Sequence, residues 1–203
     1  MKSNHWAQMI ENITSIIPEY SQDGGNITHI LLTDGQHVTI DKKNKNVIQQ
    51  LKAQSSYNVD LLMRQHSSCF AKRHLLPIPI HPKCILVPIK VRKPYGENDG
   101  AYGYVSVDHI DGIEAISPDS LKENKNSGLG MDILGGFRFR SIITLKDNLG
   151  TIPTSMQASH ISQQVAIVQS VRQEYFKNVY GIRQDEGYGV NQVKEIVVSL
   201  ATR

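Results

Sequence analysis

Residues 75–96 read LLPIPIHPKCILVPIKVRKPYG, an apolar run with the isoleucines and valines that favour β-strands. Four prolines interrupt its apolar part, residues 75–89: Pro77, Pro79, Pro82 and Pro88. Proline donates no ladder hydrogen bond, so these residues favour an edge strand or an extended surface segment and exclude a central strand. We therefore expect a stiff, extended arm at the margin of a β-sheet.

Positive charge gathers around this stretch. No Asp or Glu occurs between Arg64 and Lys93, and the segment holds seven cations: Arg64, Lys72, Arg73, Lys83, Lys90, Arg92 and Lys93. The whole chain is nearly balanced, with 22 basic and 19 acidic residues. An acid-free basic segment can attract a phosphate backbone. Solvated loops that happen to lack acidic residues would show the same charge pattern.

The 203 residues suit one domain, with enough length to bury a core. The polar residues in the opening MKSNHWAQMIENI argue against a secretory signal, and no stretch could span a bilayer, so we expect a cytoplasmic protein without membrane contact. Two cysteines cannot form a disulfide framework and are expected to be free.

Outward from the proline-rich run, the patterns predict an α+β fold with a mainly antiparallel β core. Apolar residues from Trp6 to Ile17 share a helical face that Pro18 ends, which predicts an N-terminal helix. Asp34-Gly35 predicts a hairpin between two β-rich arms, and DNLG at 147–150 predicts a second one. Further expected elements are a short helix at 46–54, strands at 85–91, 101–107 and 137–145, one long helix from about 159 to 180, and a terminal amphipathic helix.

Two constellations could carry other chemistry. His66, Cys69, His81 and Cys84 form HxxC twice and could give a tetrahedral zinc site of a protein-interaction module, but no CxxC knuckle accompanies them. Glycines at 128–136 lack the GxGxxG spacing of a phosphate loop, and no nucleophile elbow or carboxylate pair is recognisable. We expect no catalysis, no cofactor and no metal.

The order of QSSY, LPIPIHPKCILVPI, GYVSVDHI, TLKDNLGTIPTS and a Gln-containing helix resembles the ComK family of bacterial competence transcription factors over roughly residues 27–176. The matching positions are Ser55, Ser56, Tyr57, Pro77, Ile78, Pro82, Ile85, Pro88, Gly103, Tyr104, Val105, Ser106, His109, Ile110, Leu149, Gly150 and Gln164. The chain departs from the family at Asn58, Val59 and Lys90, and its insertion at 117–136 looks longer.

The resemblance implies an activator that reads A/T-rich boxes of double-stranded DNA through the minor groove as a homo-oligomer and promotes expression of DNA-uptake genes. It also implies contacts with RNA polymerase and with an adaptor of a Clp protease. The corresponding division of the chain is 1–25 for the N-terminal helix and lead-in, 26–181 for the β-rich DNA-binding domain, and 182–203 for a linker and the terminal helix. The RxHxS pattern of Arg64, His66 and Ser68 is similar to LytTR-type DNA-binding domains, a second β-rich regulator.

The candidate DNA contacts are eight basic residues: Arg64, Lys72, Arg73, Lys90, Arg92, Lys93, Arg138 and Arg140. Arginine enters the narrow minor groove of an A-tract more readily than lysine, whereas phosphates accept either, so arginines should carry the A/T preference. Arg92 and Arg73 are expected to lead. Arg138 and Arg140 alternate with two phenylalanines and should share one strand face. Apolar stripes on the two terminal helices are expected to support a dimer or a higher oligomer, although either could pack on its own domain.

Overall fold

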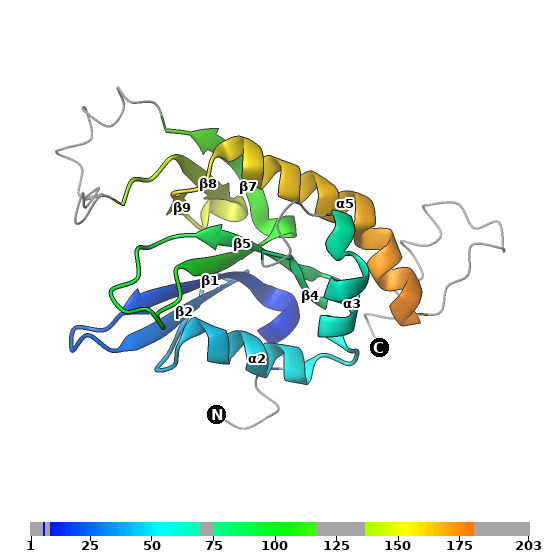
Figure 1. Ribbon diagram of the computed structural model, residues 1–203, viewed down its shortest axis with the longest axis horizontal. Helices are drawn as coiled ribbons and strands as arrows, with labels where there is room; N and C mark the ends of the chain where they lie inside the picture. Colours follow the sequence, from blue (N-terminus) through cyan, green and yellow to red (C-terminus); the bar gives the residue numbers. More distant parts are fainter. Residues whose placement is uncertain (1–5, 7–8, 70–74, 117–136, 181–203) are drawn as a thin grey trace.

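The chain folds into two antiparallel sheets with helices packed on them, as the computed structural model shows for residues 6, 9–69, 75–116 and 137–180 (Figure 1). The strands are β1 (Ile13–Tyr20), β2 (Asn26–Leu32), β3 (His37–Ile40), β4 (Ile78–His81), β5 (Cys84–Lys90), β6 (Tyr102–Ser106), β7 (Ile110–Ala115), β8 (Ser141–Leu145) and β9 (Thr151–Thr154). The α-helices are α2 (Asn44–Gln54), α3 (Val59–Gln65) and α5 (Ala158–Tyr180), with short 3-10 turns η1 (Ile10–Asn12), η2 (Ser67–Cys69), η3 (Val107–His109) and η6 (Lys146–Asn148). The α+β class with antiparallel sheets is confirmed.

The prediction of an N-terminal helix is wrong from Ile13 onward. Ile13–Tyr20 form β1, which lies between β2 and β6 inside the six-stranded sheet of order β3-β2-β1-β6-β5-β4. A strand buried on both faces reads as a nearly continuous apolar run, and Ile13, Ile16 and Ile17 also satisfy helical spacing. A division of the chain at residue 25 would cut the β1–β2 hairpin.

Two of the four prolines, Pro79 and Pro88, lie inside strands, whereas Pro77 precedes β4 and Pro82 lies in the β4–β5 turn. Pro79 lies in β4, the edge strand, as its missing N–H requires. Pro88 lies in β5, between β6 and β4, so the exclusion of a non-edge strand is wrong for β5. The strand tolerates Pro88 because β4 pairs with β5 only as far as Leu86, which leaves β6 as its single partner there.

The two faces of the six-stranded sheet bury different clusters. Ile16, Ile30 and Leu86 pack with Val47 and Leu51 of α2 on one face. On the other face, side chains of β5 and β6 pack with β8, β9 and α5: Val87, Ile89, Val105, Ile143, Ile152, Ile161 and Val168. Successive residues of β5 alternate between the clusters, as the two-residue period of a strand requires.

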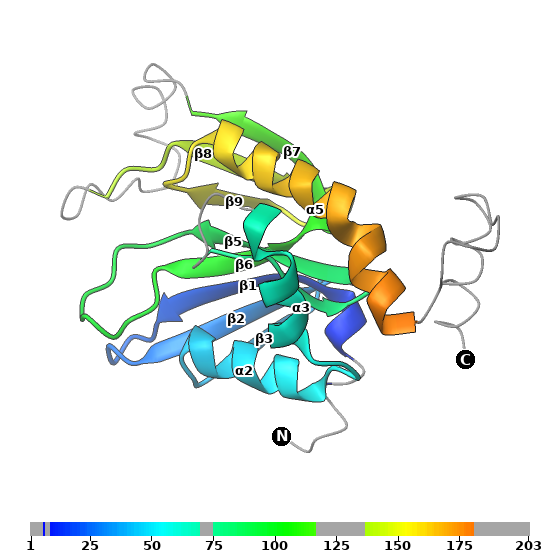
Figure 2. The same ribbon diagram turned by 45° about the vertical axis from the view of Figure 1, so that its right-hand side comes forward.

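The second sheet, of order β7-β8-β9, stands beside the first with α5 lying across it (Figures 1 and 2). Arg172 of α5 donates from Nη1 to Asp108 Oδ1 at 2.6 Å and from Nη2 to the carbonyl oxygen of Pro82 at 2.7 Å. These bonds join α5 to η3 and to the β4–β5 turn, so the helix ties the two sheets together.

Several local predictions are confirmed. The β2–β3 hairpin turns at Asp34-Gly35, where Gly35 has φ +81°. The β8–β9 hairpin turns at 146–150, α2 covers the short helix expected at 46–54, and α5 lies where a helix was expected from about 159. Among the described residues no helix combines the length and apolarity needed to cross a membrane. The expected insertion at 117–136 and terminal helix at 182–203 lie outside the described residues.

Candidate nucleic-acid interface

The β5–β6 loop forms a closed arm at one end of the molecule (Figure 1). Its base is fixed because the backbone N–H groups of Val91 and Arg92 both donate to the carbonyl oxygen of Ala101, at 3.0 and 3.3 Å. Its tip is a turn in which the Asp99 N–H donates to the Gly96 carbonyl oxygen at 3.1 Å. We call residues 91–101 the arm. Proline-stiffened β5 leads directly into it, as the sequence indicates.

Arg92 is held inside this end of the fold. Its Nε donates to the carbonyl oxygen of Gly100 at 2.7 Å, and its Nη2 donates to Asn26 Oδ1 at 2.6 Å. The guanidinium lies 4.0 Å from the ring centroid of Tyr20, a cation–π distance. Burial lowers the pKa of Arg92 from its ordinary value. The side chain thus joins the arm to the β1–β2 hairpin.

Asp99 also connects the arm to the β1–β2 hairpin. We call the contacts among Tyr20, Asn26, Arg92 and Asp99 the joint. Its carboxylate accepts hydrogen bonds from Tyr20 Oη and from Asn26 Nδ2, both at 2.9 Å, and Lys43 Nζ lies 3.4 Å away. The hydrogen bonds from Tyr20 and Asn26 hold the pKa of Asp99 at about 2, below its ordinary 3.8. The carboxylate is therefore charged at neutral pH, and its charge is compensated within the fold.

Tyr95 stands on this joint with its side chain in solvent. Its backbone N–H donates to Tyr20 Oη at 2.9 Å, and the two ring centroids lie 4.6 Å apart. The residue is nevertheless 82% exposed. Sequence reasoning missed Tyr20, Asn26, Tyr95 and Asp99. A tyrosine inside the polar turn PYGENDG was the one local signal.

Lys90, at the end of β5, lies close to the segment at 137–140, which is far from it in the sequence. Lys90 Nζ lies 5.9 Å from the ring centroid of Phe137, and the Lys90 carbonyl oxygen accepts from the N–H of Ser155 and the hydroxyl of Thr154 in β9. The segment that carries Arg138 and Arg140 therefore starts beside the base of the arm, and Figures 1 and 2 show both at the same end of the molecule.

Arg138 and Arg140 are exposed and alternate with half-buried Phe137 and Phe139. The strand predicted at 137–145 is wrong for these four residues, because β8 begins only at Ser141. Lys93, on the arm, is also exposed. Glu97 is exposed in the same arm, so positive charge here lies in individual side chains rather than in a broad basic surface.

The other candidate contacts are not part of this group. Arg64 is exposed on α3, which packs on β4, and β4 pairs with the end of β5 opposite Lys90. Its Nε donates to the Asp60 carbonyl oxygen within the helix. Arg64, His66 and Ser68 lie on a helix end and a 3-10 turn, not on a strand. Lys72 and Arg73 lie outside the described residues.

The four residues of the zinc hypothesis are not assembled into a site. No group of three or more His, Cys, Asp or Glu side chains in the described part of the chain could hold a metal ion. Cys69 is exposed, whereas Cys84 is fully buried and its Sγ lies 3.6 Å from the carbonyl oxygen of Ile13. Burial raises the pKa of the Cys84 thiol to about 12, which disfavours the thiolate that zinc requires.

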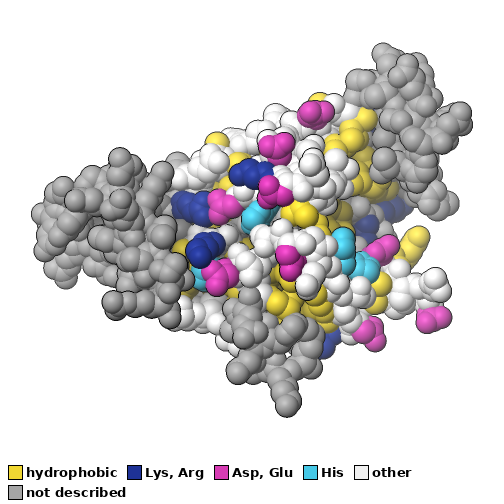
Figure 3. Space-filling view, turned by 180° about the vertical axis from the view of Figure 1, so that it is seen from behind, with side chains coloured by type: hydrophobic (Ala, Val, Ile, Leu, Met, Phe, Trp, Pro, Cys, Tyr) yellow, Lys and Arg dark blue, Asp and Glu magenta, His cyan; other side chains and the backbone are white. Residues whose placement is uncertain are grey.

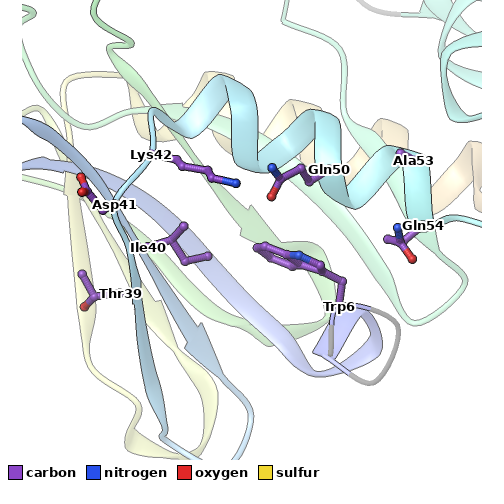
Figure 4. A pocket seen from close by; sticks show the side chains of 8 residues that line it. All are labelled: Trp6, Thr39, Ile40, Asp41, Lys42, Gln50, Ala53 and Gln54. Atoms are coloured by element: carbon purple, nitrogen blue, oxygen red, sulfur yellow. The ribbon is translucent and has the colours of Figure 1, made fainter. Parts of the chain in front are cut away.

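A pocket of about 540 Å³ lies between the end of β3 and α2 (Figure 4). Trp6 and Ile40 form its apolar floor, and Asp41, Lys42 and Gln50 line its rim. The polar part of the lining consists of one acid, one base, the Thr39 hydroxyl and the amides of Gln50 and Gln54. Trp6 is 5% exposed because it belongs to the core of its own domain.

The face opposite to that of Figure 1 carries basic and acidic side chains side by side (Figure 3). Interspersed charges of both signs attract a polyanion weakly, because their fields cancel within a few ångströms. The arm and the segment at 137–140 are therefore the better candidate for a nucleic-acid interface.

Comparison with known proteins gives no match. No family model matches the chain, and no curated protein or solved structure is significantly similar to it.

Proposed function

We propose that the chain is a sequence-specific DNA-binding transcription regulator of the ComK type that reads A/T-rich duplex through the minor groove. One observation carries the proposal: the arm and the segment at 137–140 put Lys93, Arg138 and Arg140 at the same end of the molecule as exposed Tyr95. Protruding β-hairpin arms can follow a DNA groove, and guanidinium groups suit the concentrated negative potential of a narrow minor groove.

Arg138 and Arg140 become the leading readers of the groove. Both residues are exposed, whereas the Arg92 side chain is bonded to Gly100 and Asn26. We assign Arg92 the role of positioning the arm. Lys90 and Lys93 remain candidates for phosphate contacts, because an ammonium group serves there as well as a guanidinium.

Reading paired boxes requires at least two copies, so the proposal includes a homo-oligomer. The N-terminal stripe cannot supply its interface as predicted, because Trp6, Ile10 and Ile13 are buried in the core of their own domain. The C-terminal stripe at 190–200 lies outside the described residues. Roles in DNA-uptake gene expression, with RNA polymerase and a Clp adaptor as partners, follow from the resemblance alone.

The test is fluorescence anisotropy of purified protein on an A/T-box duplex and on a G/C-rich duplex at several salt concentrations. The parent should prefer the A/T duplex. The double variant Arg138→Ala/Arg140→Ala should lose about 1 to 3 kcal/mol of discrimination for each base-specific contact removed. Lys93→Ala should weaken binding to both duplexes alike and lower the salt slope by about one.

Lys83→Ala is the matched control. Lys83 is an exposed cation on the β4–β5 turn, at the end of β5 opposite Lys90, and its Nζ lies 3.1 Å from Glu11 Oε2. This variant should bind both duplexes as the parent does. A parent protein that binds neither duplex, or binds both equally at every salt concentration, contradicts the proposal.

A further inference from the structure

We propose that Tyr95 is a wedge residue, which inserts its ring between base pairs from the minor groove and kinks the DNA. This inference rests on the proposed DNA-binding function and adds the mode of recognition: a bent duplex with a flexible pyrimidine–purine step at the wedge. The preferred ligand would then be an A/T-rich box that contains a TA step.

The first support is the exposure of Tyr95. Within the described part of the chain, Leu61 at 48% and Tyr95 at 82% are the exposed large hydrophobic side chains. Leu61 lies on a helix, whereas Tyr95 is next to the turn at the tip of the arm. The Tyr95 ring contacts the Tyr20 ring on one side, with centroids 4.6 Å apart, but most of its surface is exposed and is available to a partner.

The second support is that the exposed ring has a rigid base. The Tyr95 N–H donates to Tyr20 Oη, which in turn donates to Asp99 Oδ2, and the Gly96 N–H donates to the same carboxylate at 3.1 Å. Arg92 covers the ring of Tyr20 at 4.0 Å. Because the arm is already ordered, insertion of the ring does not carry the entropic cost of ordering a loop.

The third support is the charge around the ring. Lys93 lies two residues before Tyr95, and the segment of Arg138 and Arg140 lies at the same end of the molecule. Minor-groove proteins that insert apolar side chains combine them with basic groups, which hold the backbone on both sides of the kink. Pyrimidine–purine steps unstack most easily, so a wedge converts their flexibility into sequence preference.

The experiment measures DNA shape as well as affinity. A duplex with one A/T box and a central TA step carries a fluorophore at each end, and a second version carries 2-aminopurine at that step. The parent should raise energy transfer between the ends and raise 2-aminopurine fluorescence. Tyr95→Ala should abolish both signals and weaken A/T-box binding by about 5- to 150-fold, the range for one aromatic–base stack.

Tyr95→Phe keeps the ring and should retain both signals. Leu61→Ala removes the other exposed apolar side chain and should behave as the parent. Asp99→Asn leaves the ring in place but weakens its base, so it should reduce affinity while the bound complex still unstacks the TA step. This variant separates insertion of the ring from order of the arm.

Two results overturn the inference. If Tyr95→Ala bends the duplex and unstacks the TA step as the parent does, the ring is not a wedge. If Tyr95→Ala weakens A/T and G/C duplexes equally and the parent leaves both optical signals unchanged, the arm contacts only the backbone. In both cases the parent still prefers A/T DNA and the proposed function stands. A parent that binds no duplex overturns both.

Discussion

At the scale of single residues, the role of Arg92 in positioning the arm depends on partners that lie far from it in the sequence. The guanidinium meets Asn26 and Tyr20, which belong to another hairpin, 66 positions away in the case of Asn26. Its charge and its place in an acid-free segment were visible in the sequence, and both indicated a surface contact. No local pattern encodes a partner at that separation, so the positioning role emerges only from the folded chain.

Asp99 gives a pH-dependence that can be measured. Its folded pKa of about 2 is below the ordinary 3.8, so its contribution to stability is fully present above pH 3.8 and is lost as pH falls through 2. In the parent, the thermal unfolding midpoint should fall as the pH is lowered from 3.8 to 2. Asp99→Asn should make this fall smaller. Scans from pH 2 to 7 measure it.

Glu97→Gln is the control, because Glu97 is an exposed carboxylate of the same arm and the change in charge is equal. It should keep the acid dependence of the parent. Superimposable pH profiles for Asp99→Asn and the parent would show that the bonds to Tyr20 and Asn26 do not stabilise the charged form.

At the scale of elements, turn chemistry and strand composition predicted most of the described structure. The hairpins at Asp34-Gly35 and at 147–150 depend on glycines and short polar residues that act locally, and α2 depends on one apolar face. The prediction was wrong for the first strand, which the apolar pattern indicated as a helix. Its isoleucines fit both periods, and its position between β2 and β6 depends on segments distant in the sequence.

The contact between β1 and β6 depends on a missing side chain. A Cβ at Gly103 would lie 2.9 Å from Ile17 Cδ1 and 3.0 Å from the Ile16 carbonyl oxygen. Because one of these atoms is backbone, Gly103→Ala must push the strands apart. We expect a loss of about 1 to 3 kcal/mol in the free energy of unfolding, measured by urea denaturation.

Gly100→Ala provides the comparison, since a Cβ there meets no atom within 4 Å. Its stability should stay close to that of the parent. Equal midpoints for the two variants would mean that β6 can shift away from β1 without cost.

At the scale of the whole molecule, α5 holds together two sheets that share no ladder. Arg172 reaches Asp108 and the Pro82 carbonyl oxygen from the helix, and both groups of the ion pair are about one third exposed. A bidentate pair of this kind exceeds an ordinary surface pair in strength, but solvent screens part of it. It therefore stabilises the arrangement of the sheets moderately.

Arg172→Met should lower the free energy of unfolding by about 1 to 2 kcal/mol. A double-mutant cycle with Asp108→Asn measures the coupling, and the double variant should lose less than the sum of the two single losses. Strictly additive losses would show that the ion pair does not connect α5 to the body of the fold.

The joint beneath Tyr95 also has a consequence for the order in which parts of the chain fold. Tyr20 and Asp99 are 79 positions apart, and Asn26 and Asp99 are 73 apart. Contacts between such distant residues form late, because a large loop must close before they gain any free energy. A refolding chain should regain its local β2–β3 and β8–β9 hairpins before it regains the exposed ring on its rigid base. If Tyr95 is the wedge that we propose, a chain that has not yet formed these contacts should not bend DNA.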